Sequence, residues 1–270
     1  MALKELLVHL DQTEAATVRL RLAMELACRH ESRLTALFVD EWNIAQINRK
    51  PNPALAGEAS KASLRLREDL ESFHNSRGLE FEWHYAREFS EVAVKQASAY
   101  ADLCILGHDG TSNFSPADRA FCANVVSAIG TPVLLIPKST RAGTLGRRIV
   151  VAWDASRAAA RALNDALPLI EQSDHTTVVN VDSGMHQQTM AGLNRLAERL
   201  ARHGTRADAQ QIEALPRKSI GDVLQAKAHE LGADLIVAGA YGHARAAENI
   251  FGGVTRDLLE RTELPLLLSH

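Results

Sequence analysis

Glycines gather in one segment near the C-terminus, where their spacing favours phosphate binding. The apolar run Ala233–Ala238 leads into Gly239, and Gly242, Gly252 and Gly253 follow before a helical pattern begins. Glycine lets the backbone adopt positive φ angles and lets a ligand approach the amides, while the start of the next helix offers unpaired N–H groups. Strand-to-helix turns also use glycine for steric reasons alone. The segment therefore predicts either a phosphate cradle or a tight turn.

The elements around this segment occur twice in the chain. The matching pairs, in chain order, are Leu6–Asp11 with Ile149–Asp154, Ala101–Gly110 with Ala233–Gly242, and Thr131–Ile136 with Leu264–Ser269. Ala101 and Ala233, which begin one of these pairs, are 132 residues apart, whereas solenoid repeats have periods of about 20 to 50 residues. Matches that keep one order at this distance indicate a duplicated domain. The predicted domains are residues 1–140 and 141–270, and the polar stretch Pro137–Arg147 is the expected linker.

Short apolar runs alternate with helical patterns in each half, which indicates β-α-β units around a parallel sheet. Ser156 is a predicted N-cap for a helix that begins at Arg157. Leu79–Tyr85 alternates apolar and polar residues, so one face is expected to pack and the other to be wet. Residues 42–60 predict a long exposed connection. In the second half we expect strands at 149–153, 177–181, 207–214, 233–238 and 265–268, and helices at 157–170, 187–203, 220–231 and from 253.

The glycine segment resembles that of the universal stress protein family, whose nucleotide-binding members carry Gly, two residues, Gly, nine residues, then Gly followed by Ser or Thr. Gly239, Gly242 and Gly252 match, whereas Gly253 stands where the hydroxyl residue would contact a phosphate. The order of elements resembles this family in both halves. The resemblance implies an α/β fold of two tandem Rossmann-like, five-stranded parallel-sheet sandwiches of the adenine nucleotide-binding type. It also implies that their apolar last strands pair to form an intramolecular pseudo-dimer.

The resemblance also implies a set of site residues in the second half. In nucleotide-bound members of the family, the acidic residue closing the first strand and the backbone ending the second strand hold the adenosine. These positions are Asp154, with Ala152 and Trp153 beside it, and Val181. Trp153 either stacks on a base or plugs the pocket, and Asp154 either binds the ligand or caps the following helix. The phosphates would meet the amides of Gly239, Gly242, Gly252, Gly253 and Val254, with Thr255 offering a hydroxyl.

The implied ligand is ATP or another adenine nucleotide, and Mg, if present, would be held mostly by the phosphates. Glycine at position 253 removes one hydrogen bond, worth about 1 kcal/mol, so weakened binding is expected. The sequence carries no Walker lysine, serine elbow or zinc helix, and no catalytic residue is predicted. Two functions follow: a stress-response protein with a regulatory nucleotide, or an interaction scaffold with vestigial pockets. Slow ATP hydrolysis would need a base that the sequence does not name.

The first half is expected to be a degenerate, mainly structural copy. Gly107 and Gly110 remain, but Arg119 and Ala120 stand where the second half has Gly252 and Gly253. Their side chains would fill the cradle. His108 and Asp109 invite a catalytic interpretation, but the Asp109 carboxylate would repel phosphate.

Charge and hydropathy argue against several kinds of partner. Lys and Arg number 30 against 33 Asp and Glu, which leaves no positive field for nucleic acid or an anionic membrane. No apolar run approaches the roughly 20 residues that span a bilayer, and the N-terminus enters a strand pattern at once, so a cytoplasmic protein is expected. The 3 cysteines lack metal-ligand spacing. The protein partner, and whether two chains form a homodimer, are left open.

Overall fold

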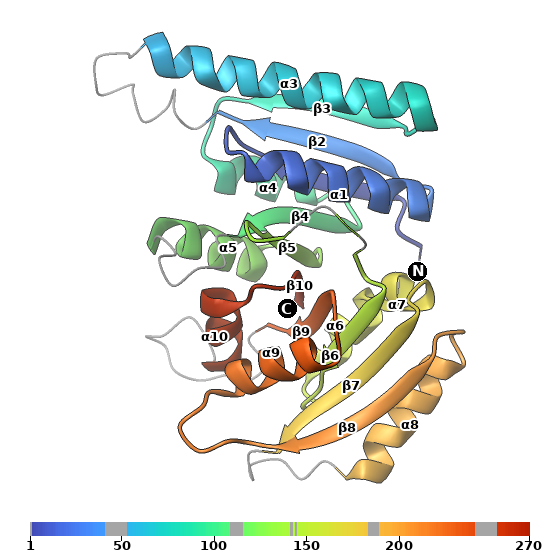
Figure 1. Cartoon of the computed structure of the whole chain (residues 1–270). Helices are drawn as coiled ribbons and strands as arrows, with labels where there is room; N and C mark the ends of the chain where they lie inside the picture. The colour runs from blue at the N-terminus through green and yellow to red at the C-terminus, as the bar shows by residue number, and fades with distance from the viewer. Residues whose placement is uncertain are drawn as a thin grey trace. The chain divides into compact units, whose positions relative to one another are not determined.

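The computed structural model describes residues 2–40, 53–108, 116–140, 143, 145–182, 189–240 and 253–270. The chain divides into two compact units, of which the N-terminal unit comprises Ala2–His108 and Ala120–Gly143 and the C-terminal unit includes Thr144–His270. Each unit holds a parallel β-sheet with helices packed on it (Figure 1). The predicted α/β fold class is confirmed.

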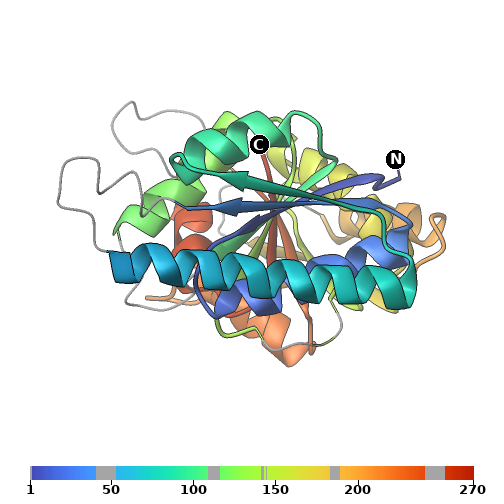
Figure 2. The ribbon, with the colours of Figure 1, turned by 90° about the horizontal axis from the view of Figure 1, so that it is seen from above.

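The sheet of the N-terminal unit has the strand order β3-β2-β1-β4-β5, and each neighbouring pair is parallel. The strands are β1 (Glu5–Leu10), β2 (Arg33–Val39), β3 (Phe81–Ala86), β4 (Leu103–His108) and β5 (Val133–Pro137). The helices are α1 (Ala15–His30), α3 (Pro53–Arg77), α4 (Ser90–Ser98) and α5 (Pro116–Ala128). Helix α1 packs on β1 and on α3, whereas α4 packs on β1 and β2 from the opposite side of the sheet (Figure 2).

The C-terminal unit repeats this topology with the strand order β10-β9-β6-β7-β8, again with parallel neighbours. The strands are β6 (Arg148–Ala152), β7 (His175–Asp182), β8 (Ala207–Glu213), β9 (Leu235–Gly239) and β10 (Leu266–Ser269). The helices are α6 (Arg157–Asp165), α7 (Leu167–Glu171), α8 (Met190–Ala201), α9 (Ile220–Glu230) and α10 (Gly253–Arg261). Helix α6 packs on β9 and β10, α8 packs on β7 and β8, and α9 packs on β7 and α10.

The central strands are continuous apolar runs because helices cover both of their faces. Leu103, Cys104, Ile105 and Leu106 in β4 are each at most 1% exposed. Leu235, Ile236 and Val237 in β9 are fully buried. Such runs are typical of parallel strands inside a doubly covered sheet.

The repeated Ala-Asp-Leu sequence has a structural role in both units. Asp102 Oδ2 accepts hydrogen bonds from the backbone N–H groups of Lys4 and Glu5, at 2.7 and 2.9 Å. Asp234 accepts the equivalent pair from Arg147 and Arg148, both at 3.0 Å. Each aspartate thus satisfies backbone donors where the first strand begins, and it fixes that strand beside β4 or β9.

Two local predictions are confirmed, the Ser156 cap and the alternation along β3. Ser156 caps α6, since its side chain accepts a hydrogen bond from Ala159 N. In β3 the polar Glu82 and His84 are exposed, while Trp83 stacks on the buried Phe38 of β2 at a centroid distance of 6.2 Å. In the part of the chain that the structure describes, no helix is long and apolar enough to cross a membrane.

Two boundaries were predicted wrongly. The helix expected over residues 157–170 is divided: α6 ends at Asp165 and α7 begins at Leu167. Pro168 lacks the N–H that would continue the hydrogen-bond ladder. The exposed connection expected through residue 60 is also too long, because α3 begins at Pro53, and proline is well suited to the first turn of a helix. Residues 41–52 lie outside the described residues.

Candidate functional site

The predicted adenosine-binding residues lie near one another at the carboxyl ends of the strands in the C-terminal sheet. Strands β6 and β9 are neighbours, with Val151 opposite Val237, so Trp153 and Asp154 follow β6 beside the point where Gly239 ends β9. The chain leaves β6 toward β7 on one side and returns to β9 on the other. This is the point where strand order reverses, and ligands of doubly wound sheets bind beyond the strand ends there. Val181, the residue before the last of β7, lies toward the same end of the sheet.

Asp154 has a structural role in the turn between β6 and α6. Its Oδ1 accepts a hydrogen bond from Ser156 N at 2.9 Å, and Ser156 in turn caps the helix. Between them Ala155 has a φ of 59°, a left-handed conformation that costs a non-glycine residue about 1 kcal/mol. The side chain of Asp154 is half-buried. The capping interpretation accounts for one carboxylate oxygen, and ligand binding through Asp154 stays a prediction.

Trp153 is fixed by its backbone. Its N–H donates to Val179 O at 2.9 Å, and its carbonyl accepts from Asn180 Nδ2 at 2.8 Å. Asn180 is only 3% exposed, and its Oδ1 accepts from Gln211 Nε2 at 3.4 Å. A buried amide must be paired, so Asn180 joins the ends of β6, β7 and β8. Sequence analysis missed this residue, although a lone asparagine in the apolar strand β7 was a usable signal.

Gly239 is required by packing. A Cβ at this position would lie 2.5 Å from the carbonyl carbon of Ala158 and 2.8 Å from its Cβ, and would also clash with Ala159 N. The first turn of α6 therefore lies directly against the end of β9. This supports the steric interpretation for Gly239 and leaves its contact with a phosphate as a prediction.

The start of α10 offers the exposed part of the predicted cradle. Gly253 is exposed, and a Cβ there would meet nothing within 4 Å. Val254 is half-buried, and Thr255 is 5% exposed. The first N–H groups of a helix have no intrahelical partner, so this end of α10 presents donors. Gly242 and Gly252 lie outside the described residues.

In the N-terminal unit an arginine side chain lies against Gly107, the counterpart of Gly239. The guanidinium of Arg19 in α1 lies where Gly107 would carry a side chain, with Arg19 Cζ 2.9 Å from the position of a Cβ. Arg19 is 2% exposed. Its Nε donates to His9 O at 2.6 Å, and its Nη2 donates to Asp11 Oδ2 at 2.7 Å. Asp11 is the counterpart of Asp154. In the N-terminal unit the guanidinium of Arg19 therefore lies beside the aspartate that follows the first strand.

The arginine perturbs the titration of its neighbours. Burial alone would raise the pKa of Asp11, but the charges of Arg19 and His9 and hydrogen bonds from Thr13 lower it to about 2. Burial, aided by the charge of Arg19, lowers the pKa of His9 to about 4. His9 Nε2 lies 3.2 Å from Ser90 Oγ, and its Nδ1 has no hydrogen-bond partner among the described residues. The cluster is therefore a neutral imidazole beside an ion pair.

The predicted filling of the first cradle by Arg119 and Ala120 stays a prediction. Both residues lie in α5, Ala120 is exposed, and the side chain of Arg119 is outside the described residues. Arg19 was missed because α1 is amphipathic and an arginine in such a helix usually faces solvent. His108 is 2% exposed, and Asp109 is outside the described residues. No group of three or more His, Cys, Asp or Glu residues suited to a metal ion occurs among the described residues.

Comparison with known proteins identifies the family of the C-terminal half. Residues 146–270 match the model of the universal stress protein family. The C-terminal half is a universal stress protein domain. No curated protein matches the sequence significantly.

Two solved structures extend the fold to the whole chain. A universal stress protein from Archaeoglobus fulgidus DSM 4304 has a TM-score of 0.76 at 18% identity, covering 98% of this chain and 95% of its own. A functionally unknown protein from Pseudomonas aeruginosa PAO1 has a TM-score of 0.65 at 15% identity, covering 99% and 92%. At these identities the similarity shows the fold alone. The tandem universal stress protein fold thus includes the N-terminal unit.

Proposed function

We propose that this chain is a stress-response protein that binds an adenine nucleotide in its C-terminal unit as a regulatory ligand. The observation that carries the proposal is the position of Trp153 and Asp154 beside Gly239, the first glycine of the segment, at the reversal point of the sheet. The adenosine would lie beside Ala152, Trp153, Asp154 and Val181. The phosphates would lie over the start of α10, where the helix N-terminus favours negative charge.

The open position at Gly253 supports this arrangement. Packing requires glycine at Gly239, where helix backbone lies close by, but packing does not require it at Gly253. A glycine that no neighbour demands leaves the backbone accessible to a ligand. Mg would be coordinated mainly by the phosphates, since Mg²⁺ commonly binds through phosphates and water with few protein ligands.

Titration calorimetry with ATP, ADP and AMP tests the proposal. We expect binding by the whole chain that Gly242→Val abolishes, because a branched side chain would cover the phosphate site. Gly110→Val, the matched change in the first half, should leave the affinity unchanged. Absence of any heat or thermal shift at millimolar nucleotide would overturn the proposal. Phosphate release faster than in buffer would show that the nucleotide is a substrate.

A scaffold with vestigial pockets is the second candidate. It is favoured by Arg19, which pairs with Asp11 and lies against Gly107 in the N-terminal unit, and by Asp154, which already accepts a hydrogen bond in the turn before α6. An experimental structure grown with nucleotide separates the two functions. Trp153 lying in an empty cleft would support the scaffold, and density for a base beside Trp153 would support the regulatory ligand.

A further inference from the structure

A groove runs along one face of the N-terminal sheet, away from the candidate nucleotide site. It lies between α4 and the strands β1, β2 and β3, on the side opposite α3 (Figure 2), and has a volume of about 700 Å³. Parallel sheets are usually covered on both faces, but α4 packs on β1 and β2 and leaves β3 open. A volume of this size is within the range of small-molecule sites.

The floor of the groove carries apolar side chains beside the polar Thr35, His84 and Gln96. Leu7 and Leu37 project from neighbouring strands, and Ala93 and Ala97 line it from α4. The two alanines are small, so the helix leaves a hollow over the leucines. Tyr100, which is 84% exposed, stands just beyond the end of α4 and also lines the groove.

Both ends of the groove carry negative charge. At one end Arg33 lies between two carboxylates, 2.5 Å from Glu82 and 3.8 Å from Glu5, and His84 Nε2 lies 3.3 Å from the other oxygen of Glu82, so two carboxylates share one arginine and one imidazole. At the other end stands Glu88, which has no ion-pair partner among the described residues. The two acidic ends are separated by the length of β3 from Glu82 to Ala86, after which Glu88 follows. These four residue steps span about 13 Å in an extended strand.

We propose that this groove binds an elongated aliphatic dication, of the diamine or polyamine class. Its two ammonium groups lie at the acidic ends, by Glu82 and Glu5 and by Glu88, and its methylene chain lies on Leu7, Leu37, Ala93 and Ala97. The order of negative, apolar and negative surface along the groove matches the order of groups in such a molecule. A neutral or singly charged chain would leave at least one acidic end without a partner.

Calorimetric titration of the full chain with three probes of equal length tests the proposal. The probes are 1,10-diaminodecane, decylamine and 1,10-decanediol. We expect the diamine to bind about tenfold more tightly than the diol, with the monoamine between them, because each exposed ion pair contributes roughly two- to fivefold. The advantage of the diamine should shrink at high salt. Equal affinities for the three probes would overturn the proposal.

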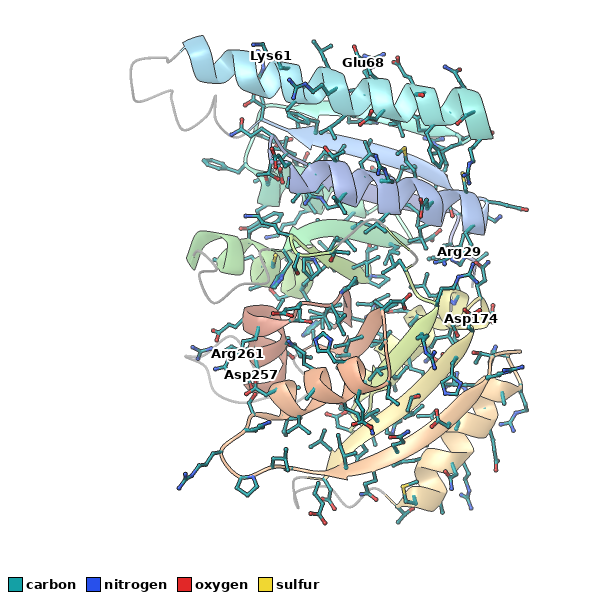
Figure 3. The ribbon with its side chains drawn as sticks, in the orientation of Figure 1. Arg29, Lys61, Glu68, Asp174, Asp257 and Arg261 are labelled. Carbon is teal, nitrogen blue, oxygen red and sulfur yellow. The ribbon has the colours of Figure 1, made fainter. Side chains whose placement is uncertain are left out.

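Matched variants locate the binding. Glu88→Gln should weaken diamine binding about two- to fivefold and leave the diol unchanged. Its control is Glu68→Gln, an exposed carboxylate on α3, on the other side of the sheet (Figure 3). Ala97→Leu should abolish binding of all three probes by filling the hollow. An equal loss from Glu68→Gln, or unchanged binding in Ala97→Leu, would contradict the assignment.

Sedimentation separates this ligand from another occupant. If the chain is a dimer and Ala97→Leu makes it dissociate into monomers, a second copy of the chain occupies the groove and the diamine proposal is wrong. A monomer that still binds the diamine supports the proposal. The groove and the nucleotide site are in different units, so neither result depends on nucleotide binding.

Discussion

The two units share one topology but differ in what lies against the end of the fourth strand. At Gly239 the neighbour is the backbone of α6, whereas at Gly107 it is the guanidinium of Arg19. Arg19 stands eight residues after Asp11, and the residue eight after Asp154 is the buried Ala162. The aspartates that fix the first strands, Asp102 and Asp234, are the same in both. A duplicated fold can therefore keep its framework while one side chain in the first helix changes what lies against the end of the fourth strand.

The largest expected effect comes from removing the internal cation. Arg19→Met should destabilise the N-terminal unit by about 3 kcal/mol, because it leaves His9 O without its donor and Asp11 without its counter-charge. Arg21→Met is the control, an exposed arginine two residues along the same helix, and should cost under about 0.5 kcal/mol. Urea unfolding followed by hydrogen exchange in β1 and β4 measures both. Equal effects would show that the Arg19 cluster contributes little.

The framework was more predictable from sequence than the site. The two parallel sheets were predicted from apolar runs and from the internal repeat. Buried parallel strands are apolar along their length, and the matching runs recur in the other half. Helical spacing places Arg19 on the apolar face of α1, between Ala16 and Ala23, but it does not show which carbonyl and carboxylate would pair with a buried guanidinium. The steric role of Gly239 was similarly hidden, since it depends on how closely α6 approaches β9.

Acid should weaken the N-terminal unit. Folded His9 has a pKa of about 4, below its ordinary value of 6.5, so between these values the unfolded chain binds more protons and stability falls as the pH falls. From pH 7 to pH 5 the loss for His9 is about 2 kcal/mol. His30, whose pKa burial also lowers to about 4, acts in the same direction.

Hydrogen exchange at pH 7 and pH 5, corrected for intrinsic rates, measures this loss. We expect a larger loss of protection in β1 and β4 than in β6 and β9, and His9→Asn should reduce the difference. Equal loss in the two units would contradict a buried neutral imidazole at position 9.

A smaller effect should come from restoring the hydroxyl at the start of α10. Gly253→Ser places a side chain in open space, so it should fold normally and tighten ATP binding about fivefold through one added hydrogen bond. Gly130→Ser is the control, because Gly130 is equally open and lies in the N-terminal unit. Calorimetry on both variants gives the comparison. Unchanged affinity in Gly253→Ser would place the phosphates away from α10.

The stoichiometry of ATP binding tests the difference between the units most directly. A single calorimetric titration of the whole chain should give one site, because in the N-terminal unit Arg19 already pairs with Asp11 and lies against Gly107, whereas in the C-terminal unit Gly253 leaves the start of α10 open. Two sites per chain would contradict the account, since the N-terminal unit would then bind nucleotide in spite of Arg19.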